Sequence, residues 1–233
     1  RVTGVGKKRA QASVRRLLEE GSGQTDGLLL LGVAGAVDPT LDTGDLVLSS
    51  RYFRDTQGIG AGHLKVAEEK ILIPDPSLWE LATKACAAGQ QQPFSLDSLT
   101  VGRVVSAPEH KKSIAGAFPV GIVEMEDYWG AEVAAEFGVA FLSARVVLDT
   151  ADQALPGWLL GLARSKRKAV MSLAARPWRI PVEFRLARQR PVAQKSLTRF
   201  ALNFLVEAAK TNGLAQKSIN SDEAEQKGLK VLA

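Results

Sequence analysis

The chain has 233 residues, of which 45% are hydrophobic, and its formal net charge is +5. That length and composition allow one α/β domain with a sizeable buried core. The single cysteine, Cys86, excludes an internal disulfide framework, and the sequence has no apolar run of about 18 residues that would suggest a membrane span. We therefore predict a cytoplasmic protein in which Cys86 is a small buried side chain.

The first predicted helix follows a short strand and a glycine turn at residues 1–6. Its apolar positions keep helical spacing and residues 21–23 end it; they are Ala10, Val14, Leu17 and Leu18. The turn Gly4-Val5-Gly6 has two interpretations. Its backbone could approach an anion at the helix N-terminus, or the glycines could simply permit tight packing, which is the commoner role of one such pair.

The middle of the chain alternates between predicted strands and helices. Leu28–Leu31 is typical of a buried central strand, and a turn at Gly32–Gly35 would let the backbone pass close to a ligand. Further strands are predicted at residues 45–53 and 99–105. A peripheral helix is predicted at residues 76–88 and a polar loop at residues 106–112.

Two apolar segments run into carboxylates, and we place the candidate site there. Val139–Leu148 is almost continuously apolar and ends at Asp149; residues 121–126 end in Glu124 and Glu126. A structural alternative is that these glutamates only begin the next helix, where acidic groups face the positive end of the dipole. The order of strand 121–126, a helix and then strand 139–148 predicts a parallel crossover. Its ligand crevice is expected at the carboxyl ends of the strands.

With these motifs the sequence resembles the nucleoside phosphorylase and nucleosidase superfamily. The matching segments are Val123-Glu124-Met125-Glu126 and Leu148-Asp149, together with Leu31–Pro39 and the segment Gly44–Leu48 that follows it. The region from Arg145 onward is most similar to the hopanoid-associated branch, which resembles methylthioadenosine/S-adenosylhomocysteine nucleosidases. The resemblance implies an α/β three-layer sandwich with a central mixed, largely parallel sheet over residues 1–210.

The resemblance also implies roles for the site residues in cleaving the N-ribosidic bond of a purine nucleoside. Asp149 would protonate purine N7, and Glu126 would accept hydrogen bonds from the ribose hydroxyls while positive charge develops on the sugar. Met125 would contact the sugar from beneath. The remaining predicted substrate contacts are Glu124, Val33, Ala34 and Gly35. The alternative function is a non-catalytic nucleoside-binding protein that retains the pocket.

Whether water or phosphate attacks the sugar stays open at this point. Some purine phosphorylases carry a phosphate-binding arginine where this chain has Leu30, which favours hydrolysis and leaves phosphate as an optional co-substrate. The family also has an earlier strand and loop, with an anion-binding glycine or an acid–base glutamate, and this sequence begins after it. No metal or other cofactor is expected: His63 and His110 lack metal-ligand spacing, and we interpret both as surface or structural residues.

The positive charge is concentrated near the C-terminus. Between positions 164 and 199 the sequence has many basic residues and one acidic residue, Glu183. We predict a long, partly helical region interrupted at Pro177, Pro181 and Pro191, then an amphipathic helix at residues 197–208 and a polar, disordered tail at 211–233. The basic region is either a solvated surface or a peripheral membrane contact. Because it lacks interleaved stacking aromatics, no nucleic-acid partner is expected. The family resemblance implies a homodimer, with its contact sought on the Trp129 helix or at residues 51–55.

Overall fold

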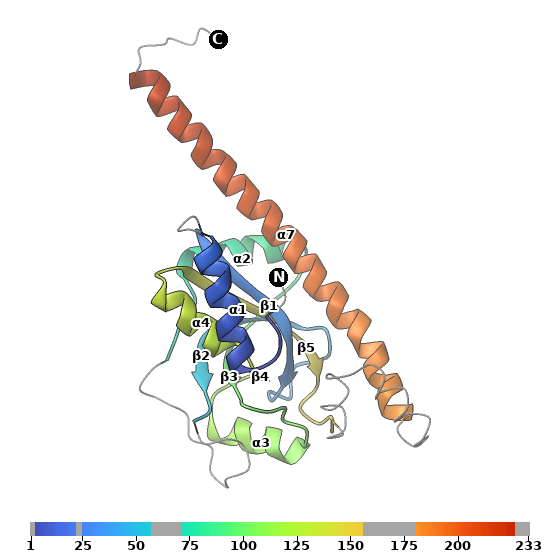
Figure 1. Ribbon diagram of the computed structural model, residues 1–233. Coiled ribbons are helices and arrows are strands. Elements are labelled where there is room, and N and C mark those ends of the chain that lie inside the picture. Colours follow the sequence, from blue (N-terminus) through green and yellow to red (C-terminus); the bar gives the residue numbers. More distant parts are fainter. Residues whose placement is uncertain (1–2, 22–24, 57–70, 156–179, 227–233) are drawn as a thin grey trace.

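The computed structural model describes residues 3–21, 25–56, 71–155 and 180–226 (Figure 1). The side chains of residues 180–187 and 212–226 lie outside the description. The elements, in chain order, are α1 (Lys7–Glu20), β1 (Gly27–Ala36), β2 (Leu46–Arg54), α2 (Pro76–Ala88), β3 (Phe94–Thr100), α3 (Pro108–Ala117), β4 (Ile122–Glu124), α4 (Asp127–Glu136), β5 (Ala140–Asp149) and α7 (Ile180–Gln226).

The five strands form a closed barrel in the order β1-β4-β3-β2-β5. Three pairs are parallel, β1 with β5, β2 with β3 and β3 with β4. The other two pairs, β1 with β4 and β2 with β5, are antiparallel. The predicted α/β class with a mixed, largely parallel sheet is confirmed. The open three-layer sandwich is wrong, because β1 pairs with β4 through Gly35 and Ala36 and thereby closes the sheet.

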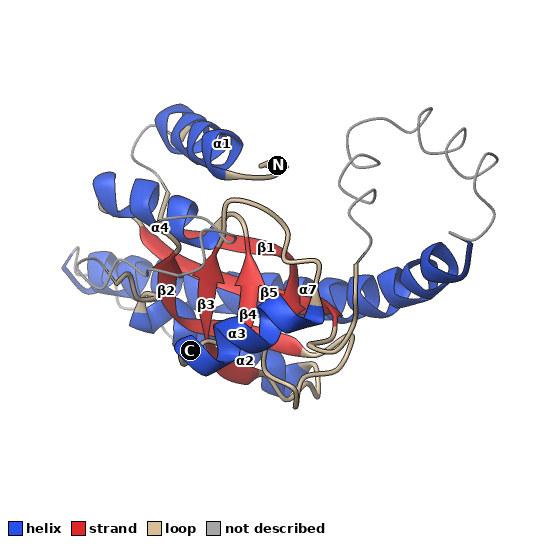
Figure 2. Cartoon of the chain, turned by 90° about the horizontal axis from the view of Figure 1, so that it is seen from below, coloured by secondary structure: helices blue, strands red, loops and turns tan. Residues whose placement is uncertain are grey.

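Helices cover the barrel on two sides (Figure 2). On one side α1 and α4 pack against β1, β2 and β5 through a cluster that includes Val14, Tyr52, Trp129 and Phe141. On the other side α2 and α7 pack on β5 through a second cluster, which includes Cys86, Leu142, Ala144, Phe200 and Phe204. Cys86 is 1% exposed, so the prediction of a buried cysteine is confirmed.

Local sequence signals explain the elements that were predicted correctly. In α2, the Asp75 side chain accepts hydrogen bonds from the amides of Ser77 and Leu78, and Pro76 takes the first helical position, where its missing N–H costs nothing. In α1, the buried positions Ala10, Val14 and Leu18 form the apolar stripe. The predicted strands at 45–53 and 139–148 correspond to β2 and β5.

Other predicted elements need correction. Residues 3–6 form no strand, and Gly32–Gly35 is not a turn, because β5 pairs with this stretch of β1. The strand predicted at 99–105 lies at Phe94–Thr100 instead. Buried polar side chains such as Asp97 and Ser98 interrupt the apolar pattern by which a buried strand is identified. The predicted loop at 106–112 contains the start of α3, which has Pro108 in its first turn.

The predicted parallel crossover through α4 is also wrong. Strand β1 lies between β4 and β5, runs antiparallel to β4 and is parallel to β5. The expected meeting of strand ends nevertheless holds for β1 and β5, since parallel partners end at the same edge.

The predicted amphipathic helix lies within α7, where Ala193, Phe200 and Phe204 are buried. Pro191 does not interrupt this helix, which begins at Ile180 and remains helical to Gln226, within the stretch assigned to a tail. Pro177 lies outside the described residues. Within the ranges the structure describes, no helix is long and apolar enough to cross a membrane.

Candidate active site

Gly35 of β1 lies between β4, which leads to Glu126, and β5, which ends at Asp149. It is paired with Val123 of β4 on one side and with Asp149 of β5 on the other. A Cβ atom at this position would lie 3.0 Å from Asp149 Oδ2, so a glycine leaves room for the carboxyl group. The structure therefore places β4 and Asp149 on either side of the glycine-rich segment. Glu126 follows β4 and contacts Arg145 and Gly6, and its meeting with Asp149 remains a prediction.

The other predicted substrate contacts divide between the surface and the core. Val33 is 44% exposed, whereas Ala34 is buried inside the barrel with Val47 and Val147. Met125 is partly buried and packs against the cluster that contains Val37. The contacts of Val33, Ala34 and Met125 with a substrate remain predictions.

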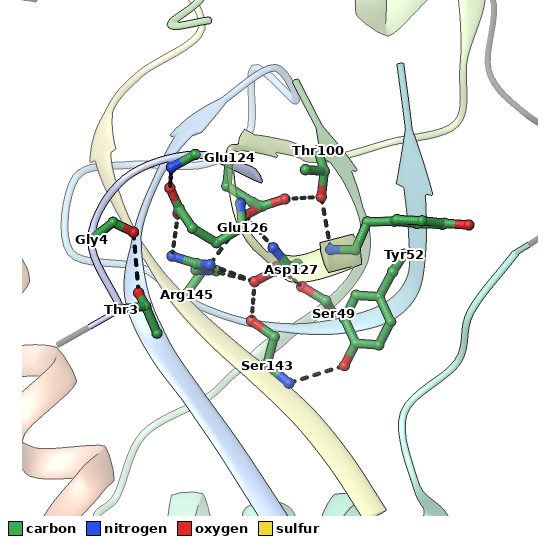
Figure 3. A network of polar contacts seen from close by, with 12 residues as sticks. Thr3, Gly4, Ser49, Tyr52, Thr100, Glu124, Glu126, Asp127, Ser143 and Arg145 are labelled. Carbon is green, nitrogen blue, oxygen red and sulfur yellow. Dashed lines mark hydrogen bonds and ion pairs between the residues drawn. The ribbon is translucent and has the colours of Figure 1, made fainter. Parts of the chain in front are cut away.

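Arg145, which sequence reasoning left without a role, lies at the centre of the polar network (Figure 3). Its Nη2 is 2.6 Å from Asp127 Oδ1 and 3.1 Å from Glu124 Oε2, and its Nη1 is 3.5 Å from Glu126 Oε2. Asp127 also accepts a hydrogen bond from the Ser143 hydroxyl at 2.6 Å. Burial opposes the charge of Arg145, but the carboxylates of Asp127 and Glu124 outweigh it and raise the pKa of the guanidinium.

Gly32 provides the space that Arg145 occupies. A Cβ atom at Gly32 would lie 2.0 Å from Arg145 Nη1, far closer than two such atoms can approach. The glycine that the sequence suggested for backbone contact with a ligand therefore accommodates a buried arginine. A basic residue within an otherwise apolar strand was the signal that could have revealed this network.

Glu124 has a structural role at the start of α4. Its Oε2 accepts hydrogen bonds from the backbone amides of Glu126, at 2.5 Å, and Asp127, at 2.7 Å, and its Oε1 accepts one from the Thr100 hydroxyl. The alternative of a carboxylate at a helix N-terminus is thus confirmed for Glu124. Burial, and then the nearby Asp127 charge, raise its pKa to about 8, although Arg145 opposes the shift.

Glu126 is more accessible than Glu124, with 13% of its side chain exposed. Its Oε1 accepts a hydrogen bond at 2.9 Å from the backbone amide of Gly6, the residue that precedes α1. The anion that faces the glycine turn and the start of α1 is therefore a side chain of the protein. Arg145 on one side and Gly6 on the other fix the orientation of Glu126.

Asp149 forms an ion pair that was not foreseen. Its Oδ2 accepts a hydrogen bond at 2.5 Å from the ammonium group of Lys111 on α3. Burial raises the pKa of Asp149, and the charge of Lys111 opposes that rise. The sequence pattern of residues 106–112 predicted a loop, so no role was predicted for Lys111. Pro108 followed by Glu109 is the helix-start signal in this segment.

Several other residues singled out in the sequence are not part of the ion pairs around Arg145 and Lys111. Arg51 binds Asp97, and the guanidinium of Arg54 lies 5.1 Å from the ring centroid of Tyr128. His110 is exposed on α3, consistent with a surface role, and His63 lies outside the described residues. Within the described ranges, no three His, Cys, Asp or Glu side chains form a group that could hold a metal ion.

Comparison with known proteins gives a family match over most of the chain. The family model described as the phosphorylase superfamily matches residues 2–175. A 5′-methylthioadenosine/S-adenosylhomocysteine nucleosidase from Shewanella oneidensis is 29% identical over 160 residues, which cover 66% of this chain and 67% of the relative. The corresponding nucleosidase from Staphylococcus aureus is 28% identical over 158 residues, which cover 64% of this chain and 67% of the relative.

Solved structures share the fold. A nucleosidase of the same name from Neisseria meningitidis, in complex with methylthio-immucillin-A, superposes with a TM-score of 0.66 at 19% identity, covering 88% of this chain and 78% of its own. The futalosine hydrolase of Helicobacter pylori gives a TM-score of 0.63 at 20% identity, covering 88% of this chain and 77% of its own.

Proposed function

The chain belongs to the phosphorylase superfamily, and we propose that it cleaves the N-ribosidic bond of a purine nucleoside, with adenine nucleosides as the first candidates. The observation that carries this proposal is that β1 and β5 connect the two carboxyl groups: Gly35 is paired with Asp149, and Gly32 is paired with Arg145, whose Nη1 lies 3.5 Å from Glu126 Oε2. The related nucleosidases and futalosine hydrolase support the same reaction class.

The two carboxyl groups suit the charge changes of this reaction. As the bond breaks, positive charge develops on the ribose and electrons flow into the purine, so catalysis needs an anion near the sugar and an acid near the base. Glu126, held by Gly6 and Arg145, would accept hydrogen bonds from the ribose hydroxyls. Asp149, whose pKa is raised by burial, would donate a proton to purine N7 and make the base a better leaving group.

We propose hydrolysis as the main reaction. Leu30, at the position where some phosphorylases have an arginine, is buried in the core cluster next to α1 and α4. Among the described residues, Arg145 and Lys111 contact Glu126 and Asp149, and each binds carboxylates of the protein itself. Both cations are therefore already paired with anions of the protein.

The decisive experiment is incubation of the full-length protein with methylthioadenosine, S-adenosylhomocysteine and adenosine, with and without phosphate. We expect release of free adenine at a rate that phosphate does not change. Acceleration by phosphate, with formation of a ribose 1-phosphate, would show phosphorolysis instead. Tight binding of a nucleoside without any release of base would support the alternative of a non-catalytic nucleoside-binding protein.

We further propose an adenosylated hopanoid lipid as a substrate, presented at a membrane surface by α7. The exposed side of this helix carries basic residues together with apolar ones. They are Arg188, Arg190, Lys195 and Arg199, with Val192, Leu202, Leu205 and Val206. Such a face fits anionic headgroups, with apolar side chains reaching the interface. Gln189 of α7 hydrogen-bonds Gln153 at 2.7 Å, which joins this helix to the segment that follows Asp149.

Vesicle binding tests the membrane contact. We expect co-sedimentation with anionic but not neutral vesicles, and weakening at high salt because ions screen the attraction. The double variant Lys195→Gln/Arg199→Gln should bind about 30-fold more weakly, at about 1 kcal/mol for each basic residue. The matched control, Lys8→Gln/Arg16→Gln on α1, should bind like the parent. Equal binding to both vesicle types, or to neither, would contradict electrostatic docking by α7. A water-soluble nucleoside would then be the better substrate proposal.

A homodimer is also proposed, on the family resemblance alone. Trp129 is 8% exposed and packs within its own chain, where the ammonium of Lys7 lies 4.1 Å from its ring centroid. The exposed end of α4 at Phe137 and the half-exposed Arg51 are therefore the parts of the two predicted contacts that remain accessible.

A further inference from the structure

Lys111 is a fully buried lysine beside the proposed acid. Its side chain is 0% exposed, and it reaches from α3 to the end of β5. Its ammonium nitrogen lies 2.5 Å from Asp149 Oδ2, 2.5 Å from the carbonyl oxygen of Thr150 and 3.3 Å from that of Gln153. An ammonium group has three N–H donors, so this arrangement uses all of them.

Packing alone does not account for a charged residue at this position. Removing an ammonium group from water is costly, and a well-packed apolar side chain can often replace a buried ion pair without loss of stability. The contact between α3 and the turn after β5 also has a backbone hydrogen bond, from the Leu155 amide to the Ser106 carbonyl at 2.7 Å. What a lysine adds there is a hydrogen-bond donor with a positive charge, directed at one carboxyl oxygen.

We propose that Lys111 is a positioning residue for Asp149, which binds Oδ2 and leaves Oδ1 directed to the nucleobase. The inference rests on the proposed function for the role of Oδ1. Among the described residues, Asp149 Oδ1 has no hydrogen-bond partner, whereas Oδ2 is bound to Lys111. Gly35 leaves room for both carboxyl oxygens, because a Cβ atom at this position would lie 3.0 Å from Oδ2 and 3.4 Å from Oδ1.

The same contact adjusts how strongly Asp149 holds its proton. Burial raises the pKa of Asp149, and the adjacent ammonium charge limits the rise. Other charged groups nearby are directed elsewhere: Arg145 binds the carboxylates of α4 and β4, and Asp152, His110 and Lys112 are exposed. A general acid works best when its pKa is near the working pH, and Lys111 keeps a buried carboxyl group from retaining its proton too tightly.

The test compares Lys111→Met, which keeps an unbranched side chain one atom shorter and removes the charge, with Lys112→Met at the exposed neighbouring position. The titration of the Asp149 carboxyl is followed by carbon NMR on aspartate-labelled protein, and its signal is assigned by its loss in Asp149→Asn. Since an adjacent opposite charge lowers a carboxyl pKa by about 1–3 units, Lys111→Met should raise the pKa of Asp149 by at least about one unit. Lys112→Met should not change it.

The pH profile of base release gives the second readout. Because Asp149 must be protonated to act, the alkaline limb of kcat/KM should move to higher pH in Lys111→Met by the same amount as the NMR titration. An unchanged Asp149 titration, with activity lowered equally at every pH, would overturn the proposal and leave Lys111 as a structural tie. The NMR result does not need turnover, so an inactive parent enzyme would contradict the proposed function without affecting this test.

A double variant covers the case in which Lys111→Met is folded but too unstable for the titration. Lys111→Met/Asp149→Asn removes both charges, so no uncompensated carboxylate remains buried. It should unfold at a higher urea concentration than Lys111→Met alone. Equal sensitivity of the single and double variants to urea would contradict a direct charge interaction between the two residues.

Discussion

Replacing Asp149 with Asn is expected to lower kcat/KM for purine release by about 10²–10⁴-fold, measured below the urea concentration at which the variant unfolds, because Asn also leaves the Lys111 ammonium without its anion. The substitution keeps the shape of the side chain and removes the proton that a general acid supplies, and such proton transfers contribute rate factors of this size. The loss should appear in kcat, because the proton transfer belongs to the transition state and not to nucleoside binding. Adenine release and nucleoside affinity, measured separately, distinguish these two effects.

The matched control is Asp152→Asn, the same chemical change three residues along the chain. Asp152 is exposed and accepts a hydrogen bond from the Thr150 hydroxyl, so this variant should retain activity within about threefold. If Asp149→Asn also stayed within threefold of the parent, Asp149 would not be the acid. Loss of activity in both variants would instead indicate that the turn after β5 is sensitive to any change.

The position of Asp149 could be predicted because its signal is local in the sequence. An apolar run that ends in a carboxylate identifies the end of a buried strand, and β5 ends at Asp149. The same kind of signal identified Glu126 and the start of α4. What these patterns do not contain is the partner of each carboxylate, because Lys111 and Arg145 reach Asp149 and Glu126 through tertiary contacts.

The closure of the sheet was unpredictable for a related reason. Strand β4 is only three residues long, and two of its residues, Ile122 and Val123, pair with β1. So short a pairing leaves no periodic signal, and the glycines of β1 indicated a turn where a strand continues. Gly32 is needed because Arg145 lies against it, a requirement that appears only when β1 and β5 are side by side.

The largest effect on stability is expected for Arg145→Met. Arg145 is 3% exposed and faces the carboxylates of Glu124, Glu126 and Asp127. Removing one partner from a buried charge network leaves uncompensated charge, which typically costs about 3–5 kcal/mol. Urea unfolding should therefore show the variant close to the limit of folding. Arg16→Met is the control, since Arg16 forms an exposed pair with Glu20 on α1, and such pairs contribute about 0.5 kcal/mol or less.

The cost of Arg145→Met should grow with pH. The pKa of Glu124 is about 8 in the folded protein against an ordinary value of 4.5, so between these values the folded state binds more protons than the unfolded state. The free energy of unfolding of the parent therefore falls as pH rises through that window. Loss of the guanidinium removes an interaction that favours the ionised form of Glu124, which raises the pKa of Glu124 further and makes the fall larger.

Urea unfolding of the parent and Arg145→Met at about pH 5 and about pH 8 tests this expectation. The difference between the two proteins should be larger at the higher pH, where the carboxyl groups must ionise without their cation. Adding Glu124→Gln to Arg145→Met should recover part of the lost stability at pH 8, because one buried charge is then absent. A difference that is small, or the same at both pH values, would mean that water or another cation compensates these carboxylates, and that Glu126 does not depend on Arg145 for its orientation.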